Sequence, residues 1–270
     1  MKRKINMVGG GFQHDICSSA GHIPKYIEWV KNPHEADISI HIDFGIINNK
    51  VDISKKNYAW LAESKTINKG LYEWCSSNIE YIENNFELLF THDKHLLGLS
   101  DKFVETICGA KHWVKNVGIH NKTKLISMIS STKNMCPEHS HRQTIVNNYR
   151  NKLDLYGRGY NEINNKEIGL IDYHFSIAME NHTYDLAYSE KLTDCFATGT
   201  IPIYYGSKLI SEICNVDGVI MLDNDFNIDK LTPELYNSKI DAIYENYNIA
   251  INMPVAEDYI YEKYIKNNEN

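Results

Sequence analysis

The chain has 270 residues and a mass of 31.2 kDa, which is enough for one large α/β domain or two small ones. Hydrophobic residues make up 43% and charged residues 23%, which excludes collagen-like, coiled-coil and wholly disordered classes. A net charge of −7 argues against a nucleic-acid binder, because such proteins gather many Lys and Arg contacts to phosphates. The apolar runs are far shorter than the ~18 residues that span a bilayer, so no transmembrane segment is predicted.

The amino terminus is basic, but the glycines at positions 9–11 and the polar residues after them interrupt any apolar segment. We therefore expect a cytoplasmic protein, with the inner face of a membrane as an alternative location. The six cysteines include no Cys-x-x-Cys pair, which predicts free thiols rather than a zinc knuckle or a disulfide framework. They are Cys17, Cys75, Cys108, Cys136, Cys195 and Cys214. The sequence does not predict the oligomeric state.

The first half of the chain alternates between strand-like and helix-like patterns. Period-two apolar residues predict strands, and a helical pattern follows the third of them. The expected strands are 4–8, 36–44, 57–64 and 86–93, and the expected helix is 69–84. The pattern lapses over 112–122, where we expect a hinge.

The second half repeats the alternation. Strands are expected at 124–131, 153–157, 172–180, 200–206 and 219–222, and helices at 139–151, from Ser189, at 208–214, from Pro233 and at 256–266. This order predicts an α/β fold with two Rossmann-like domains facing a cleft. The expected domains are 1–117 and 118–253, with a helix in 254–270 that can pack back on the first.

The densest polar block lies between residues 172 and 207. A buried strand ends at Glu180 and Asn181, and a loop leads to Ser189, Glu190 and Lys191 at a helix start. Ser is a good N-cap, and the first-turn amides beside a lysine favour an anion such as phosphate. The block therefore predicts an anion site beyond the strand ends, although a capped helix with solvated charges has the same spacing.

This block resembles the donor-binding signature of glycosyltransferase family 10, the α-1,3/α-1,4-fucosyltransferases. In that family, Glu-Asn at a strand end is followed by Thr-Glu-Lys, here Ser189-Glu190-Lys191, and then by an Ile-Pro-x-Tyr-x-Gly strand, here residues 201–206. The segments 124–131 and 153–161, with Arg142 between them, and "WLAES" at 60–64 are similar to further family elements. The family's usual Tyr position holds Ala187 here, and Tyr188 follows it.

The resemblance implies a GT-B fold and an inverting transfer of fucose from GDP-fucose to a glycan hydroxyl. We expect α-1,3 or α-1,4 linkage to a GlcNAc- or Glc-type residue of an oligosaccharide or glycoconjugate acceptor. Glu63 is then the candidate catalytic base. The expected donor-binding residues are Arg142 and Lys191 at the diphosphate, Glu190, Asn181 and Glu180 at sugar hydroxyls, Ser189 at the helix cap, and Tyr188 in place of the family's Tyr.

Two alternatives stay open on these residues. The donor can be another nucleotide sugar, linked to GDP or to UDP, or the chain can be a non-catalytic nucleotide or sugar binder on the same scaffold. Asp223-Asn224-Asp225 has the oxygen ligands that Mn²⁺ or Mg²⁺ prefers. We expect no metal site and no required cofactor, and treat either ion as a non-essential addition.

Overall fold

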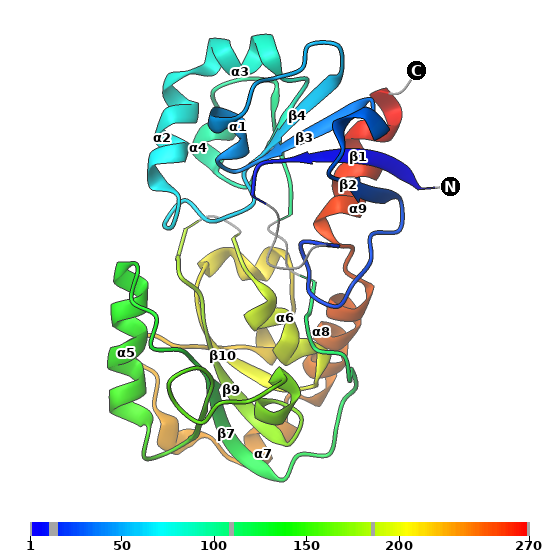
Figure 1. The fold of residues 1–270 in the computed structure, drawn as a ribbon. Coiled ribbons are helices and arrows are strands. Elements are labelled where there is room, and N and C mark those ends of the chain that lie inside the picture. The colour runs from blue at the N-terminus through cyan, green and yellow to red at the C-terminus, as the bar shows by residue number, and fades with distance from the viewer. Residues whose placement is uncertain (1, 11–15, 108–110, 185–186, 269–270) are drawn as a thin grey trace. The chain divides into compact units, whose positions relative to one another are not determined.

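The computed structural model describes residues 2–10, 16–107, 111–184 and 187–268. It divides into two compact units: unit 1 is Met1–Gly109 with Pro254–Asn270, and unit 2 is Ala110–Met253. Each unit is an α/β domain built on one parallel sheet (Figure 1). No helix within these ranges combines the length and the apolar composition that crossing a bilayer requires.

The sheet of unit 1 has six parallel strands in the order β2-β1-β3-β4-β5-β6. The strands are β1 (Arg3–Val8), β2 (Ile27–Val30), β3 (Ile38–Ile42), β4 (Lys56–Trp60), β5 (Leu89–Thr91) and β6 (Phe103–Glu105). Its helices are α1 (Gly45–Asn48), α2 (Lys69–Ser77), α3 (Ile79–Asn85), α4 (Lys94–Leu97) and α9 (Ala256–Ile260), which continues into a π turn (Tyr261–Ile265).

Both faces of this sheet are covered, as parallel sheets require. Side chains alternate along β4: Tyr58 and Trp60 pack in one core cluster, and Ala59 packs in the other. The first cluster includes Ala256 and Ile260 of α9, while the second is closed by α2, α3 and α4. The last segment of the chain therefore completes the hydrophobic core of unit 1.

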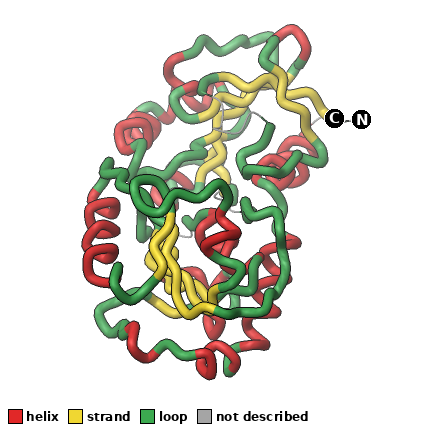
Figure 2. The backbone as a smooth tube through the Cα atoms, turned by 60° about the horizontal axis from the view of Figure 1, so that its bottom comes forward, coloured by secondary structure: helices red, strands yellow, loops and turns green. Residues whose placement is uncertain are grey.

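The sheet of unit 2 has five parallel strands in the order β11-β10-β9-β7-β8, with helices on both sides (Figure 2). The strands are β7 (Lys124–Ile129), β8 (Asp154–Tyr156), β9 (Tyr173–Met179), β10 (Ile201–Tyr205) and β11 (Ile220–Met221). The helices are α5 (Pro137–Tyr149), α6 (Glu190–Ala197), α7 (Pro233–Asn237) and α8 (Ile240–Asn252). Every residue of the central strand β9 is buried, as expected of a strand with both faces covered.

Several element boundaries differ from the sequence-based expectation. The strand predicted for 57–64 ends at Trp60, so Glu63 lies in the following loop. The helix predicted for 69–84 is two helices, because Asn78 leaves the helical region at φ −127° and ψ 42° and its side chain bonds the Trp74 carbonyl. The short strands β2 and β6 were not predicted.

The segment 112–122, predicted as a hinge, packs into unit 2 instead. The unit boundary lies at residue 110 rather than at 118. Val114 is a buried member of the unit 2 core, and the Trp113 and Val114 amides both donate to Asp194 Oδ1 of α6. These two hydrogen bonds attach the segment to the second sheet's helical layer. Five cysteines of the described ranges are free and buried, and Cys108 lies outside those ranges.

Candidate functional site

A cavity of about 330 Å³ opens at the carboxyl edge of the unit 2 sheet. It is lined by the end of β7 (residues 129–131), the end of β9 (residues 176–179), the loop after β8 and the start of α6. β7 and β9 are neighbours in the sheet. From β7 the chain continues outward to β8 at one edge of the sheet, and from β9 it continues to β10, toward the opposite edge. This cavity, called the switch-point cavity below, therefore lies where the strand order reverses, which is where open α/β sheets bind their ligands.

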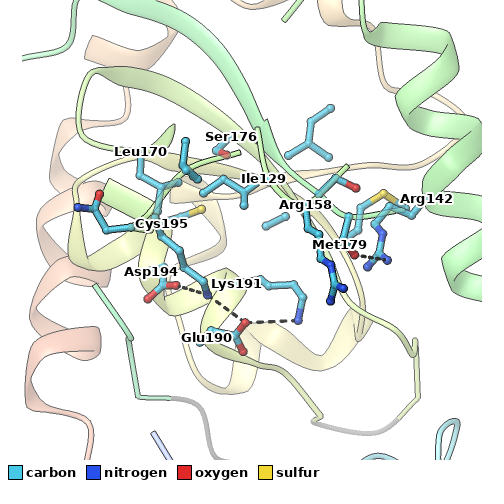
Figure 3. A pocket seen from close by; sticks show the side chains of 18 of the residues that line it. Ile129, Arg142, Arg158, Leu170, Ser176, Met179, Glu190, Lys191, Asp194 and Cys195 are labelled. Carbon is cyan, nitrogen blue, oxygen red and sulfur yellow. Dashed lines mark hydrogen bonds and ion pairs between the residues drawn. The ribbon is translucent and has the colours of Figure 1, made fainter. Parts of the chain in front are cut away.

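A glycine brings the chain after β8 close to the end of β7. Gly157 has a φ of +107°, and a Cβ atom there would collide with the carbonyl oxygen of Ser130. Only glycine fits this position without strain. The close approach leads directly to Arg158, whose side chain extends toward the cavity with those of Arg142 and Lys191 (Figure 3).

The start of α6 is held by a buried carboxylate. Glu180, 2% exposed, follows β9 and accepts hydrogen bonds from the Ser189 amide (2.8 Å) and the Ser189 hydroxyl (2.6 Å). Ser189 in turn caps α6 by accepting from the Lys191 amide. The strand end thus fixes where the first turn of α6 lies, and with it Glu190 and Lys191 at the cavity wall.

Two lysines and two carboxylates form a charge network along α6. Lys166 Nζ lies 3.0 Å from Glu190 Oε1 and 2.7 Å from Asp194 Oδ2, and Lys191 Nζ lies 3.7 Å from Glu190 Oε1. Burial alone would raise the pKa of Glu190, but Lys191 and Lys166 outweigh it and lower that pKa to about 2. Burial likewise opposes the charge on Lys191, yet Glu190 and Glu180 raise the pKa of Lys191. Glu190 is therefore ionised and Lys191 is protonated at neutral pH.

Arg142 is a buried cation whose charge is only weakly balanced by neighbouring polar groups. It is 8% exposed, and its Nη2 makes only long contacts, 3.5 Å to Ser131 Oγ and 3.4 Å to the Lys133 carbonyl. Its Nε has no hydrogen-bond partner, and no carboxylate of the described ranges pairs with it. Burying a charge without a partner is costly, so a cation placed this way at a cavity wall favours an anionic ligand.

Three of the predicted donor-binding residues line the cavity: Arg142, Glu190 and Lys191. Glu180 and Ser189 lie behind them and support the start of α6. The other two point elsewhere. Asn181 Oδ1 bonds the ring of His182 at 2.8 Å, and Tyr188 is buried in the unit 2 core with its hydroxyl 3.5 Å from Met253 Sδ.

Sequence reasoning missed several lining residues: Ser131, Arg158, Lys166 and Asp194. Arg158 stands inside the segment 153–161 that already carried the family resemblance, so its sequence signal was available. Lys166 gave no such signal, because its role comes from pairing with Asp194, 28 positions away. Its ammonium also lies 4.6 Å from the centre of the Trp113 ring.

Glu63 belongs to unit 1, in the loop after β4, and is exposed. Three hydrogen bonds hold it. Its amide donates to Asp43 Oδ1 (3.2 Å), its carbonyl accepts from the Tyr72 hydroxyl (2.8 Å), and its Oε1 accepts from the Ser64 amide (2.8 Å). A carboxylate fixed this way at the carboxyl edge of a sheet is suited to accept a proton from a ligand.

Asp43, which lies under this loop, is held in a strained conformation. Its φ of +48° is the one positive value among the non-glycine residues that the structure describes. Oδ1 also accepts from the Ala62 amide at 2.9 Å. Burial raises the pKa of Asp43 to about 6, the two amide hydrogen bonds lower it, and the nearby Glu63 charge adds to the rise. Strain and desolvation gathered beside one loop are typical of functional sites.

The predicted Asp-x-Asp element, residues 223–225, lies apart from the switch-point cavity of unit 2. Asp223 and Asn224 line a different cavity of unit 2, and Asp223 Oδ1 accepts the Asp225 amide at 3.0 Å. Across the ranges that the structure describes, no group of three or more His, Cys, Asp or Glu side chains is arranged to hold a metal ion.

We expect Asp43→Asn to change how the stability of unit 1 depends on pH. The folded-state pKa of Asp43, about 6, lies above the ordinary aspartate value of 3.8, so the wild type loses stability as pH rises through this window. Asn keeps a side-chain oxygen that can accept the two backbone amides, and it tolerates a positive φ. Between pH 4 and pH 7, the free energy of unfolding of the variant should therefore rise relative to wild type by on the order of 2 kcal/mol.

Urea unfolding at a series of pH values measures this difference. Asp37→Asn is the matched control, because the Asp37 side chain is 79% exposed. A difference between Asp43→Asn and wild type that stays constant across this range would contradict the desolvated carboxylate.

Comparisons with known proteins agree on the class of this chain. Residues 119–249 match the model of the glycosyltransferase family 10 (fucosyltransferase) C-terminal domain, and no curated protein matches the sequence. The structure is similar to an α1,3-fucosyltransferase with GDP (TM-score 0.56, 15% identity, covering 100% of this chain and 91% of that one). It is also similar to TarM (TM-score 0.56, 13% identity, covering 86% and 55%). The chain thus has the GT-B fold and is a glycosyltransferase, and its residues 119–249 are similar to the family 10 C-terminal domain.

Proposed function

We propose that the chain transfers fucose from GDP-fucose to a hydroxyl group of a glycan acceptor, with inversion at the anomeric carbon. The expected linkage is α-1,3 or α-1,4 to a GlcNAc- or Glc-type residue. The observation that carries the proposal is Arg142, a buried guanidinium with an unbonded Nε at the wall of the switch-point cavity. Such a cation calls for an anionic ligand, and a nucleoside diphosphate supplies one.

The cavity has three features suited to a diphosphate. Arg142 and Lys191 line it, Arg158 adds a third cation, and the capped first turn of α6 turns its positive end toward the same region. Guanidinium groups bind phosphate oxygens through paired charge-assisted hydrogen bonds. These groups would neutralise the negative charge that GDP gains as the glycosidic bond breaks.

Glu190 supports the sugar part of the nucleotide in this proposal. Its Oε1 is engaged by Lys166 and Lys191, and an ionised carboxylate accepts hydrogen bonds on both oxygens. Glu190 can therefore accept a ribose hydroxyl without giving up its lysine partners. Glu180 and Ser189 act as positioning residues, because they hold the start of α6 rather than line the cavity.

Glu63 is the proposed general base. The acceptor hydroxyl oxygen forms a bond to the anomeric carbon while its proton passes to the Glu63 carboxylate. The bond from the anomeric carbon to the phosphate oxygen breaks, and its electron pair leaves with GDP. The hydrogen bonds that hold the Glu63 amide, carbonyl and Oε1 support this role because they fix the loop before the substrate arrives.

The choice of GDP-fucose is supported by the similar structures. One α1,3-fucosyltransferase structure contains GDP and a second structure contains GDP-fucose, the latter with a TM-score of 0.50 and 16% identity. Another nucleotide sugar is the second candidate. It is favoured by Tyr188, which packs in the core of unit 2 and so does not supply the ring that the family places near the donor. A cytoplasmic location stays a prediction.

Glu63→Gln should abolish transfer while GDP binding stays within about twofold of wild type. Gln cannot accept the acceptor's proton, and general-base catalysis is worth roughly 10²–10⁴ in rate. Turnover with GDP-fucose and a panel of lactose- and N-acetyllactosamine-type acceptors measures the rate. Glu73→Gln, an exposed carboxylate of α2, is the matched control. Retained turnover in Glu63→Gln would remove Glu63 from its role.

Lys191→Ala should weaken the binding of GDP by roughly 10- to 100-fold, because a hydrogen bond to a charged group is worth about 1.5–3 kcal/mol. The affinity for guanosine, which has no phosphate, should fall by less than about threefold. Titration calorimetry with both ligands separates the two effects, and Lys152→Ala, an exposed lysine paired with Asp229, is the control. Equal losses for GDP and guanosine would rule out a phosphate contact.

Transfer should continue in the presence of EDTA, since Arg142 and Lys191 provide the positive charge at the diphosphate. Asp225→Asn should likewise keep its rate within about twofold of wild type, because Asp225 does not line the switch-point cavity. Loss of activity on EDTA treatment, restored by Mn²⁺, would instead favour a metal-dependent donor such as a UDP-sugar.

A further inference from the structure

Unit 2 has a second cavity, about 780 Å³, at the carboxyl ends of β10 and β11. Its walls come from α5, the end of β10, and the loop that follows β11. Its volume is within the range of small-molecule sites. None of the residues that the proposed function uses lies in its wall, so its ligand is a separate question.

Aromatic rings line this second cavity. The rings of His141 and Tyr205 lie 4.8 Å apart at an interplanar angle of 48°, and both are half-buried. Tyr149 of α5 also lines the cavity. Ring faces at a water-exposed opening suit a ligand that has both apolar C–H faces and polar edges.

Polar groups that bind hydroxyls also line the second cavity. Asp223 and Asn224 are exposed and reach the cavity from the loop after β11, and Thr183 joins them. One oxygen of Asp223 accepts the Asp225 amide, and no other partner of its carboxylate occurs in the described ranges. A carboxylate and an amide accept and donate to hydroxyls. Lys208 is exposed and also lines the cavity, so its charge offsets that of Asp223 and the wall favours neither an anion nor a cation.

The second cavity adjoins the first. His141 and Arg142 are consecutive residues of α5, so they point about 100° apart on the helix and face different cavities. The Tyr205 carbonyl accepts the Glu180 amide at 2.8 Å, and Glu180 holds the start of α6. A ligand in the second cavity therefore lies beside the diphosphate end of the switch-point cavity.

We propose that this cavity is a subsite for a neutral saccharide of the acceptor. The rings of Tyr205 and His141 contact the C–H face of a pyranose, and Asp223 and Asn224 bind its hydroxyls. The inference deepens the proposed function and rests on it, since the transferase activity is what supplies a reason for an acceptor glycan beside the nucleotide. It also gives the Asp-x-Asp element a role that needs no metal.

Saccharide binding to the GDP-saturated protein tests the subsite. Saturation-transfer NMR is recorded with N-acetylglucosamine, glucose, galactose, lactose and N-acetyllactosamine, each up to about 20 mM, which detects weak complexes. We expect at least one sugar to bind. Tyr205→Ala and Asp223→Ala should each weaken it at least about tenfold, whereas Tyr205→Phe, which keeps the ring, should stay within about threefold.

GDP affinity, measured in parallel by calorimetry, separates the two hypotheses. Failure of wild type to bind GDP would count against the proposed function. If GDP binds and none of the five sugars does, or if sugar binding survives both Tyr205→Ala and Asp223→Ala, the subsite is overturned. Asp223 is exposed, so its variant keeps the test decisive even if Tyr205→Ala fails to fold.

Discussion

The site in unit 2 depends on how buried charge is balanced around the start of α6. Glu180, Glu190 and Asp194 share two lysines, Lys166 and Lys191. Removing one partner of a buried ion pair leaves an uncompensated charge and destabilises strongly. The network therefore permits only a narrow range of positions for the first turn of α6, whose capped end meets the cavity.

The same network reaches beyond the cavity. Asp194 Oδ2 pairs with Lys166, and its Oδ1 accepts the amides of Trp113 and Val114. The segment that leads into unit 2 is thus bonded to the helix that carries Glu190 and Lys191. Arg142 differs from these groups because it has no carboxylate partner in the described ranges. This guanidinium is therefore available to a ligand at the cavity wall.

Much of the fold could be predicted from local pattern. The apolar run 172–180 indicated the central strand β9, and Ser189 before Glu190 indicated the start of α6. The domain boundaries were harder to predict from the sequence. The segment 112–122 has no periodic pattern, and what places it in unit 2 is a hydrogen bond to Asp194, about 80 positions away along the chain. Periodicity does not carry information about such contacts.

The site was predicted in part for the same reason. Glu190 and Lys191 belong to a motif with fixed spacing, Arg142 lies between two segments that carry the family resemblance, and all three line one cavity. Tyr188 was assigned by its place next to the motif, but it is a residue of the hydrophobic core, where a large apolar ring is favoured. Asp43 was missed because its role depends on a backbone conformation, φ +48°, and on amides 19 and 20 positions away.

A crystal structure of the protein with GDP tests the central claim most directly. We expect the diphosphate at the carboxyl ends of β7 and β9, with its oxygens within hydrogen-bonding distance of the Arg142 guanidinium and of Lys191 Nζ. GDP bound in the cavity beside Tyr205 and Asp223, or bound with both of those cations turned away from its phosphates, would contradict it.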